Sequence, residues 1–152
     1  MVKNKNLGFT LVELLISISI IALLTVVASI SYSKAQKSSR DQKRIGDLKA
    51  IQEAAEQYYL LNNGAYPDGN NFYRSNTSWS VDGQNVLQAF PSDPKGDGYE
   101  NGGEYFCNVF TDSAYCVCAY MEDTDNGNSS GWSDCSSLNN SGGQYYCVRS
   151  QQ

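Results

Sequence analysis

The sequence predicts an α+β fold in which one long N-terminal α-helix packs on a small C-terminal antiparallel β-sheet. Three observations support this prediction. The chain has no proline between Met1 and Pro67, so nothing in that stretch breaks a helix. Short aromatic and β-branched runs replace the helical pattern in the last third of the chain. All five cysteines lie in that last third, where disulfides would stabilise a small polar domain.

The first part of the predicted helix is apolar enough to cross a membrane. Residues 11–30 contain a single charged residue, Glu13, and as a helix they would be roughly 30 Å long, about one hydrocarbon thickness. Lys3 and Lys5 precede this segment, so the positive-inside rule predicts a cytoplasmic N-terminus, although five cations also follow it. We therefore expect a single-pass membrane protein whose remainder lies outside the cytoplasm.

The helix is expected to continue to about residue 61. Apolar residues recur there at spacings of three and four, which predicts an amphipathic second half that carries a small domain on one face. This stripe consists of Ile45, Leu48, Ile51, Ala55 and Tyr58 or Tyr59. The Asn62-Asn63-Gly64 run, followed by Pro67, predicts the end of the helix. The expected segments are thus a transmembrane helix over 9–31, an amphipathic half over 32–64 and a globular head over 65–152.

The head is predicted to contain a three- or four-stranded antiparallel sheet packed on the helix stripe. Residues 104–110, 114–121 and 144–150 are the strand candidates, because each run is rich in aromatic and β-branched residues. A turn-rich insert, residues 122–143, separates the last two. The eleven tyrosines of the chain are interpreted mainly as strand and core residues.

The cysteines predict disulfides in an oxidising compartment. The candidates are Cys107, Cys116, Cys118, Cys135 and Cys147. The number is odd, so one thiol stays unpaired or pairs between chains. We favour the pairs Cys135–Cys147 and Cys107–Cys116. Cys116 and Cys118 would share a strand face, so Cys118 could replace Cys116 in that scheme. The Cys-x-Cys spacing argues against structural zinc.

Composition narrows the possible functions. The chain has no histidine, which excludes Ser-His-Asp and Cys-His catalysis and histidine-ligated metal sites. Its formal net charge of −5 argues against nucleic acid as a partner. The Gly-rich stretch 96–103 lacks the strand–turn–helix context of a phosphate-binding loop. We therefore do not predict an enzyme.

The stretch LGFTLVELLISI, residues 7–18, resembles the N-terminus of type IV prepilins and of type II secretion pseudopilins. A short basic leader ends in Gly8, Phe9 and Thr10-Leu11 follow, and Glu13 lies within an apolar helix. The resemblance implies a pilin fold and a prepilin peptidase that cuts between Gly8 and Phe9 on the cytoplasmic side and N-methylates Phe9. Residues 1–8 would then be a leader that is removed, while the apolar helix stays on the mature protein.

Glu13 is costly in a bilayer, by about 2.5–3.5 kcal/mol for a lone carboxylate on insertion scales. The helix dipole offsets part of this cost near the N-terminus. The resemblance implies that Glu13 pairs with the Phe9 amine of the preceding subunit as the helix moves from the bilayer into a filament. We hypothesise that this pair helps to set the axial register, because other registers would strand a charge.

The resemblance extends into the body of the chain. Residues 48–67 and 90–99 are similar to the helix end and to the Pro-x-Asp-Pro-x-Gly segment of secretion pseudopilins, with Lys95 in place of their usual aromatic residue. The relatives bind calcium in an acidic loop near the C-terminus, and Glu122, Asp123 and Asp125 lie in a comparable place. Short acidic loops are usually only solvated, so we expect no cofactor and retain calcium as the alternative. Many pilins have proline where this chain has Ile30, and the cysteine-rich tail is similar to pilins rather than to pseudopilins.

The predicted function is a structural subunit of a type IV pilus-like filament. One alternative is a pseudopilin of a type II secretion system, and another is a minor pilin acting as a surface- or DNA-binding module. The expected partners are copies of the chain itself, other pilins, the prepilin peptidase and an inner-membrane assembly platform. The expected location is the inner (cytoplasmic) membrane, followed by an extracellular or periplasmic filament.

Overall fold

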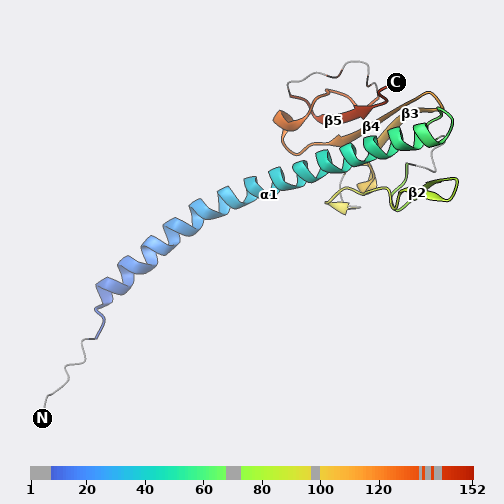
Figure 1. Cartoon of the computed structure of the whole chain (residues 1–152). Helices are drawn as coiled ribbons and strands as arrows, with labels where there is room; N and C mark the ends of the chain where they lie inside the picture. The colour runs from blue at the N-terminus through green and yellow to red at the C-terminus, as the bar shows by residue number, and fades with distance from the viewer. Residues whose placement is uncertain (1–7, 68–72, 97–99, 134, 136–137, 139–141) are drawn as a thin grey trace, which may run out of the picture. The chain divides into compact units, whose positions relative to one another are not determined.

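The computed structural model describes residues 8–67, 73–96, 100–133, 135, 138 and 142–152 (Figure 1). Its elements are the helix α1 (Leu11–Leu61) and the strands β1 (Trp79–Val81), β2 (Gln84–Leu87), β3 (Phe106–Thr111), β4 (Ala114–Tyr120) and β5 (Tyr145–Arg149). Two 3₁₀ helices, η2 (Glu100–Gly103) and η3 (Thr124–Asn126), lie between the strands. The chain divides into two compact units, one up to Gln36 and one over Lys37–Gln152. The predicted α+β architecture is confirmed.

α1 is a single helix of 51 residues, as the absence of proline predicted. Its C-terminus has the geometry that the Asn-Asn-Gly run predicts. Asn63 (φ 55°) and Gly64 (φ 81°) are left-handed, and the Gly64 N–H donates to the Tyr59 carbonyl at 3.0 Å. This backbone bond back over five residues is the Schellman ending, in which left-handed residues satisfy the last helical carbonyls.

Within the unit Lys37–Gln152, the predicted apolar stripe is the face of α1 that packs on the head. Leu48, Ile51 and Ala55 are fully buried, whereas Ile45, Tyr58 and Tyr59 pack at its margin. The buried face begins earlier than the stripe, however. Asp41 and Arg44 are also fully buried, and the apolar periodicity gave no indication of this.

The described residues of the head form two antiparallel sheets rather than the single sheet that was predicted. β3, β4 and β5 form a three-stranded sheet in that order, and the three strand candidates are confirmed. β1 and β2 form a separate hairpin that we did not predict. Its turn is Asp82-Gly83, with φ of 49° and 80°. An Asp-Gly pair between short strands is a strong hairpin signal, so the sequence did carry this information.

The core of the head is largely aromatic and includes Tyr66, Tyr73, Trp79, Phe90 and Tyr115, as the tyrosine interpretation anticipated. Buried tyrosine hydroxyls need acceptors, and α1 supplies them. Tyr66 and Tyr115 donate to the Glu56 carboxylate, and Tyr105 donates to Asp47 at 2.7 Å. Acidic residues at the edge of the helix stripe therefore fix aromatic residues of the head.

Two glycines allow the segments around η3 and before β5 to cross closely. A Cβ atom at Gly127 would overlap the carbonyl of Gly143, and one at Gly143 would overlap the backbone of Ser129. The Tyr145 carbonyl accepts hydrogen bonds from Asn128 N and Ser129 N at 2.8 and 2.9 Å. The turn-rich insert thus lies tightly against the start of β5, and any larger residue at either glycine would separate them.

Candidate functional site

The apolar part of α1 is exposed along its whole length. Between Leu11 and Ile30 its large apolar side chains are 52% (Ile16) to 79% (Leu11) exposed, whereas such side chains are normally buried. This part of the helix is long and apolar enough to span a membrane. Nothing in the described part of the chain covers this surface. It therefore requires lipid or other protein around it.

The hydroxyl side chains of this segment are compatible with an apolar environment because the helix itself satisfies them. Ser17 donates to the Glu13 carbonyl at 2.7 Å, Ser19 to the Leu15 carbonyl at 2.8 Å and Ser29 to the Thr25 carbonyl at 2.8 Å. Such bonds to the preceding turn spare each hydroxyl the cost of an unpaired polar group in hydrocarbon.

The start of α1 is a capping box formed by Thr10 and Glu13. The Glu13 N–H donates to the Thr10 hydroxyl oxygen at 3.2 Å, and the Thr10 N–H donates to the Glu13 carboxylate at 2.8 Å. The Thr10 hydroxyl also donates to this carboxylate, at 2.8 Å. This arrangement matches the Thr-x-x-Glu pattern, which satisfies two of the free N–H groups at a helix start. The pattern is visible in the sequence, so the cap was predictable alongside the assembly contact expected of Glu13.

The predicted processing point lies directly before this cap. Gly8 and Phe9 precede the helix, Phe9 is 89% exposed, and a Cβ at Gly8 would meet no atom within 4 Å. The bond between them is therefore sterically open to a peptidase. The rest of the leader, residues 1–7, lies outside the described residues.

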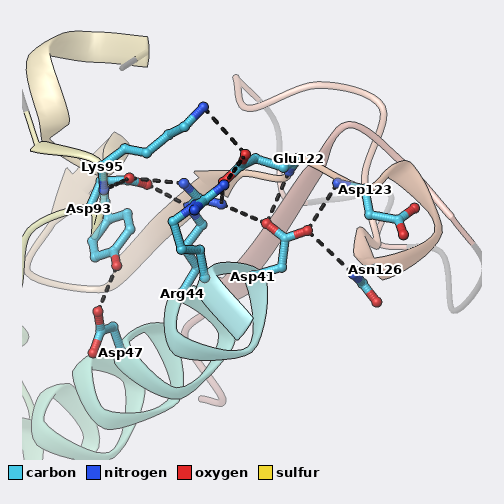
Figure 2. Close-up of polar contacts among 10 residues, drawn as sticks. Asp41, Arg44, Asp47, Asp93, Lys95, Glu122, Asp123 and Asn126 are labelled. Carbon is cyan, nitrogen blue, oxygen red and sulfur yellow. Dashed lines mark hydrogen bonds and ion pairs between the residues drawn. The ribbon is translucent and has the colours of Figure 1, made fainter. Parts of the chain in front are cut away.

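Arg44 of α1 joins the helix to two segments of the head through a buried ion cluster (Figure 2). Its guanidinium contacts Asp93 through two hydrogen bonds, of 2.6 and 2.9 Å, Asp41 at 2.6 Å and Glu122 at 3.2 Å. Burial by itself would lower the pKa of Arg44, but the hydrogen bonds to Asp93 and the other carboxylates raise it instead. Arg44 thus stays charged and holds α1, the segment before η2 and the segment after β4 together.

Glu122 is the second centre of this cluster. Its two carboxylate oxygens each accept a hydrogen bond from Arg40, at 2.6 and 2.8 Å, and Oε2 also lies 3.3 Å from the Lys95 ammonium. Hydrogen bonds from Arg40 are the main cause that lowers the pKa of Glu122 to about 2. Asp41 completes the arrangement, since its carboxylate accepts the backbone N–H groups of Glu122 and Asp123 at 3.0 and 2.9 Å.

This geometry bears on the calcium alternative. Glu122 is already held by three cations, and Asp123 caps η3 by accepting the Asp125 N–H at 3.2 Å. Of the three candidate ligands, only Asp125 has a carboxylate with no described partner. Calcium binding at this loop stays a prediction.

The disulfide pairing that we favoured is wrong. The bonds are Cys116–Cys135 and Cys118–Cys147, and Cys107 is free. Strand register gives the reason. Cys107 lies opposite Val117, so its side chain is on the α1 side of the sheet, whereas Cys116 and Cys118 are on the other face. Burial raises the pKa of the Cys107 thiol far above its usual value, so it stays protonated.

The two disulfides therefore lie side by side on the outer face of the three-stranded sheet. The sulfur atoms of Cys116 and Cys118 are 3.8 Å apart. They tie β4 to Cys135 in the insert and to Cys147 in β5. The prediction that Cys116 and Cys118 share a face is confirmed. It follows from the two-residue period of a strand alone.

These features define a class of protein: a small disulfide-bonded α+β head on a long helix whose apolar N-terminal part follows an exposed glycine. Residues 3–29 match the family described as the prokaryotic N-terminal methylation motif. The chain thus carries the N-terminal signature of type IV prepilins and pseudopilins, as its sequence predicted. No curated protein and no solved structure shows significant similarity to the chain. The motif and the apolar helix are consistent with anchoring in the inner membrane.

Proposed function

We propose that this chain is a structural subunit of a type IV pilus-like filament. The observation that carries the proposal is the exposed apolar surface of residues 11–30, directly after the methylation motif. A lipid bilayer covers such a surface while the subunit is a monomer, and the equivalent helices of other copies cover it in a filament. Membrane anchor and filament core are therefore successive roles of one segment.

In this proposal a prepilin peptidase cuts between Gly8 and Phe9 on the cytoplasmic face and methylates the new amine of Phe9. An inner-membrane assembly platform then moves the subunit from the bilayer into the filament. The two adjacent disulfides support exposure of the head to an oxidising environment outside the cytoplasm.

Glu13 has two roles that mutagenesis can separate. The carboxylate caps its own helix, and in the filament it would pair with the Phe9 amine of the preceding subunit. Gln serves in a capping box as well as Glu does. Glu13→Gln should therefore keep the helix start but remove the charge, whereas Glu13→Leu removes both. We expect both variants to be processed and both to assemble poorly. Wild-type assembly and axial rise in Glu13→Gln would contradict the register role.

A pseudopilin of a secretion system is the second candidate. It is favoured by Asp93, which lies in the segment similar to secretion pseudopilins and joins α1 through Arg44. Long surface fibres would favour the pilin, while a short periplasmic assembly and a calcium-dependent rise in Tm would favour the pseudopilin. We expect no change in Tm between EDTA and millimolar calcium.

A DNA-binding minor pilin receives less support. Residues 50–152 contain thirteen acidic residues and three basic ones. The net negative charge of the head and the end of α1 therefore repels phosphate. A surface-binding role would leave the subunit at a filament tip, so its abundance relative to other fibre proteins tests that alternative.

The deciding experiment is intact-mass analysis and N-terminal sequencing of sheared surface fibres. We expect a chain that begins at methylated Phe9 and lacks residues 1–8. Gly8→Ile is the matched control, because a bulky residue beside the scissile bond should leave the uncut chain in the membrane fraction. Finding the wild-type chain uncut, beginning at Met1 and confined to membranes, would overturn the proposal.

A further inference from the structure

Charge is distributed very unevenly within the unit Lys37–Gln152. Residues 37–49 of α1 hold five basic and two acidic residues, whereas residues 50–152 hold three basic and thirteen acidic ones. One short helical segment is therefore net positive, and the rest of the unit is strongly negative. When two surfaces of one molecule carry opposite charge, copies attract each other through these surfaces, whereas surfaces of the same charge repel.

The basic residues of this segment fall into two groups. Arg40 and Arg44 are used within the chain, in the ion cluster with Glu122. Lys37, at the start of the segment, is exposed. Lys43 and Lys49 are exposed too, and neither forms an ion pair with any described residue. Gly46 lies between them, and a Cβ built there would meet no atom within 4 Å. Glycine is disfavoured inside a helix, yet nothing in the described part of this chain approaches it closely.

The acidic counterpart is the loop that contains η3, with the carboxylates of Glu122, Asp123 and Asp125. Its backbone is fixed at Asp41, which accepts N–H groups of Glu122 and Asp123. Figure 2 shows the Asp123 carboxylate turned away from Arg44 and Asp41. Asp125 is exposed and enters no ion pair among the described residues. The loop thus presents carboxylates outward from a backbone that α1 holds in place.

The basic and acidic surfaces lie at the same level of the helix but on opposite sides of it. Asp41 and Lys43 are two residues apart, which corresponds to about 3 Å along the axis and about 200° around it. Asp41 points into the head and holds the acidic loop, so Lys43 points away from that loop. A copy placed beside this one, in the same orientation, would bring its acidic loop to Lys43.

We propose that the exposed face of α1 around Lys43, Gly46 and Lys49 binds the Asp123–Asp125 loop of a neighbouring copy of this chain. The contact joins two different surfaces, so it can repeat from copy to copy into an open filament, which a two-fold dimer contact could not do. Gly46 lets the neighbouring loop approach the helix backbone. This inference rests on the proposed function, and it names the head-to-helix contact that accompanies packing of the apolar helices.

Charge reversal tests the contact. Lys43→Glu and Asp125→Lys should each reduce the yield of sheared fibres by about tenfold, because each places like charges in the contact. The double variant should restore the yield to within about twofold of wild type, because it re-forms the pair with its polarity reversed. Arg74→Glu and Asp112→Lys, at exposed positions elsewhere on the head, are the matched controls and should assemble normally.

Two readouts keep this test separate from the proposed function and from misfolding. Methylated Phe9 in wild-type fibres checks the proposed function, and an unchanged Tm of each variant in detergent checks the fold. Carbodiimide treatment of wild-type fibres should join Lys43 or Lys49 to Asp123 or Asp125 of another copy. Fibres that form normally with either single reversal would overturn the contact. So would loss of fibres in Lys43→Glu without rescue by Asp125→Lys, which would point to anionic lipid headgroups as the partner of Lys43.

Discussion

The two parts of α1 have the same secondary structure but depend on different surroundings. Residues 11–30 expose nearly every apolar side chain, whereas between Asp41 and Ala55 the helix buries both apolar residues and a pair of charges. The first part needs lipid or other protein around its apolar surface. The second is stabilised by its own head. A substitution in the first part should therefore alter assembly, and one in the second should alter folding.

The largest effect should come from Arg44→Met. This change leaves the carboxylates of Asp41, Asp93 and Glu122 buried without their shared cation, which should cost about 3–5 kcal/mol of unfolding free energy. Ile20→Ala, in the exposed apolar part, should leave the stability of the head unchanged. Urea unfolding of the full chain in detergent measures both.

Tryptophan fluorescence is a suitable probe for this measurement, because Trp79 is fully buried in the head. Lys43→Met is the control for loss of a nearby cation, since Lys43 is exposed. Equal stability of Arg44→Met and Lys43→Met would show that the ion cluster does not hold the head together.

Removing a disulfide should have the next largest effect. The bond Cys118–Cys147 closes a loop with a sequence separation of 29, so the Cys118→Ser, Cys147→Ser double variant should lose about 3 kcal/mol. Cys107→Ala, at the free thiol, should cost about 1 kcal/mol or less. Peptide mapping without reduction checks the pairing itself, and a Cys107–Cys116 peptide would contradict it.

Acid should weaken the head through Glu122, whose pKa is lowered from 4.5 to about 2 in the folded chain. A lowered carboxylate pKa contributes stability that is fully present above pH 4.5 and is lost as the pH falls toward 2. The contribution is at most about 3 kcal/mol. Tm should therefore stay level from pH 7 to 5 and fall below that. In Glu122→Gln the fall should be shallower and Tm at pH 7 lower. Identical pH profiles for the two proteins would remove Glu122 as the cause.

The smallest effect should be a gain from Gly46→Ala. Alanine is favoured over glycine inside a helix by about 1 kcal/mol, and the new methyl group meets no atom of this chain. Tm of the subunit in detergent should rise slightly. Fibre yield should fall nevertheless if a neighbouring loop approaches the helix there. An increase in both Tm and fibre yield would show that Gly46 has no role in assembly.

Much of the molecule was predictable because local patterns determined it. The end of α1 follows from Asn63 and Gly64, and the three strands of the larger sheet follow from their residue types. The Thr10–Glu13 cap and the Asp82-Gly83 turn were also predictable, because Thr-x-x-Glu and Asp-Gly are local signals. These features depend on residues that are neighbours in the chain, so no knowledge of the fold is needed to find them.

The sequence by itself determined the helix, its apolar segment, the methylation motif and the shared face of Cys116 and Cys118. Only the tertiary structure decided which cysteines pair, because strand register places Cys107 on the opposite face from the other sulfurs. It also decided which charged residues after the apolar segment are buried. Arg44 and Asp41 are buried because Asp93 and Glu122, 49 and 78 residues from Arg44, converge on them. Partners so distant in sequence leave no periodic signal, and folding alone brings them together.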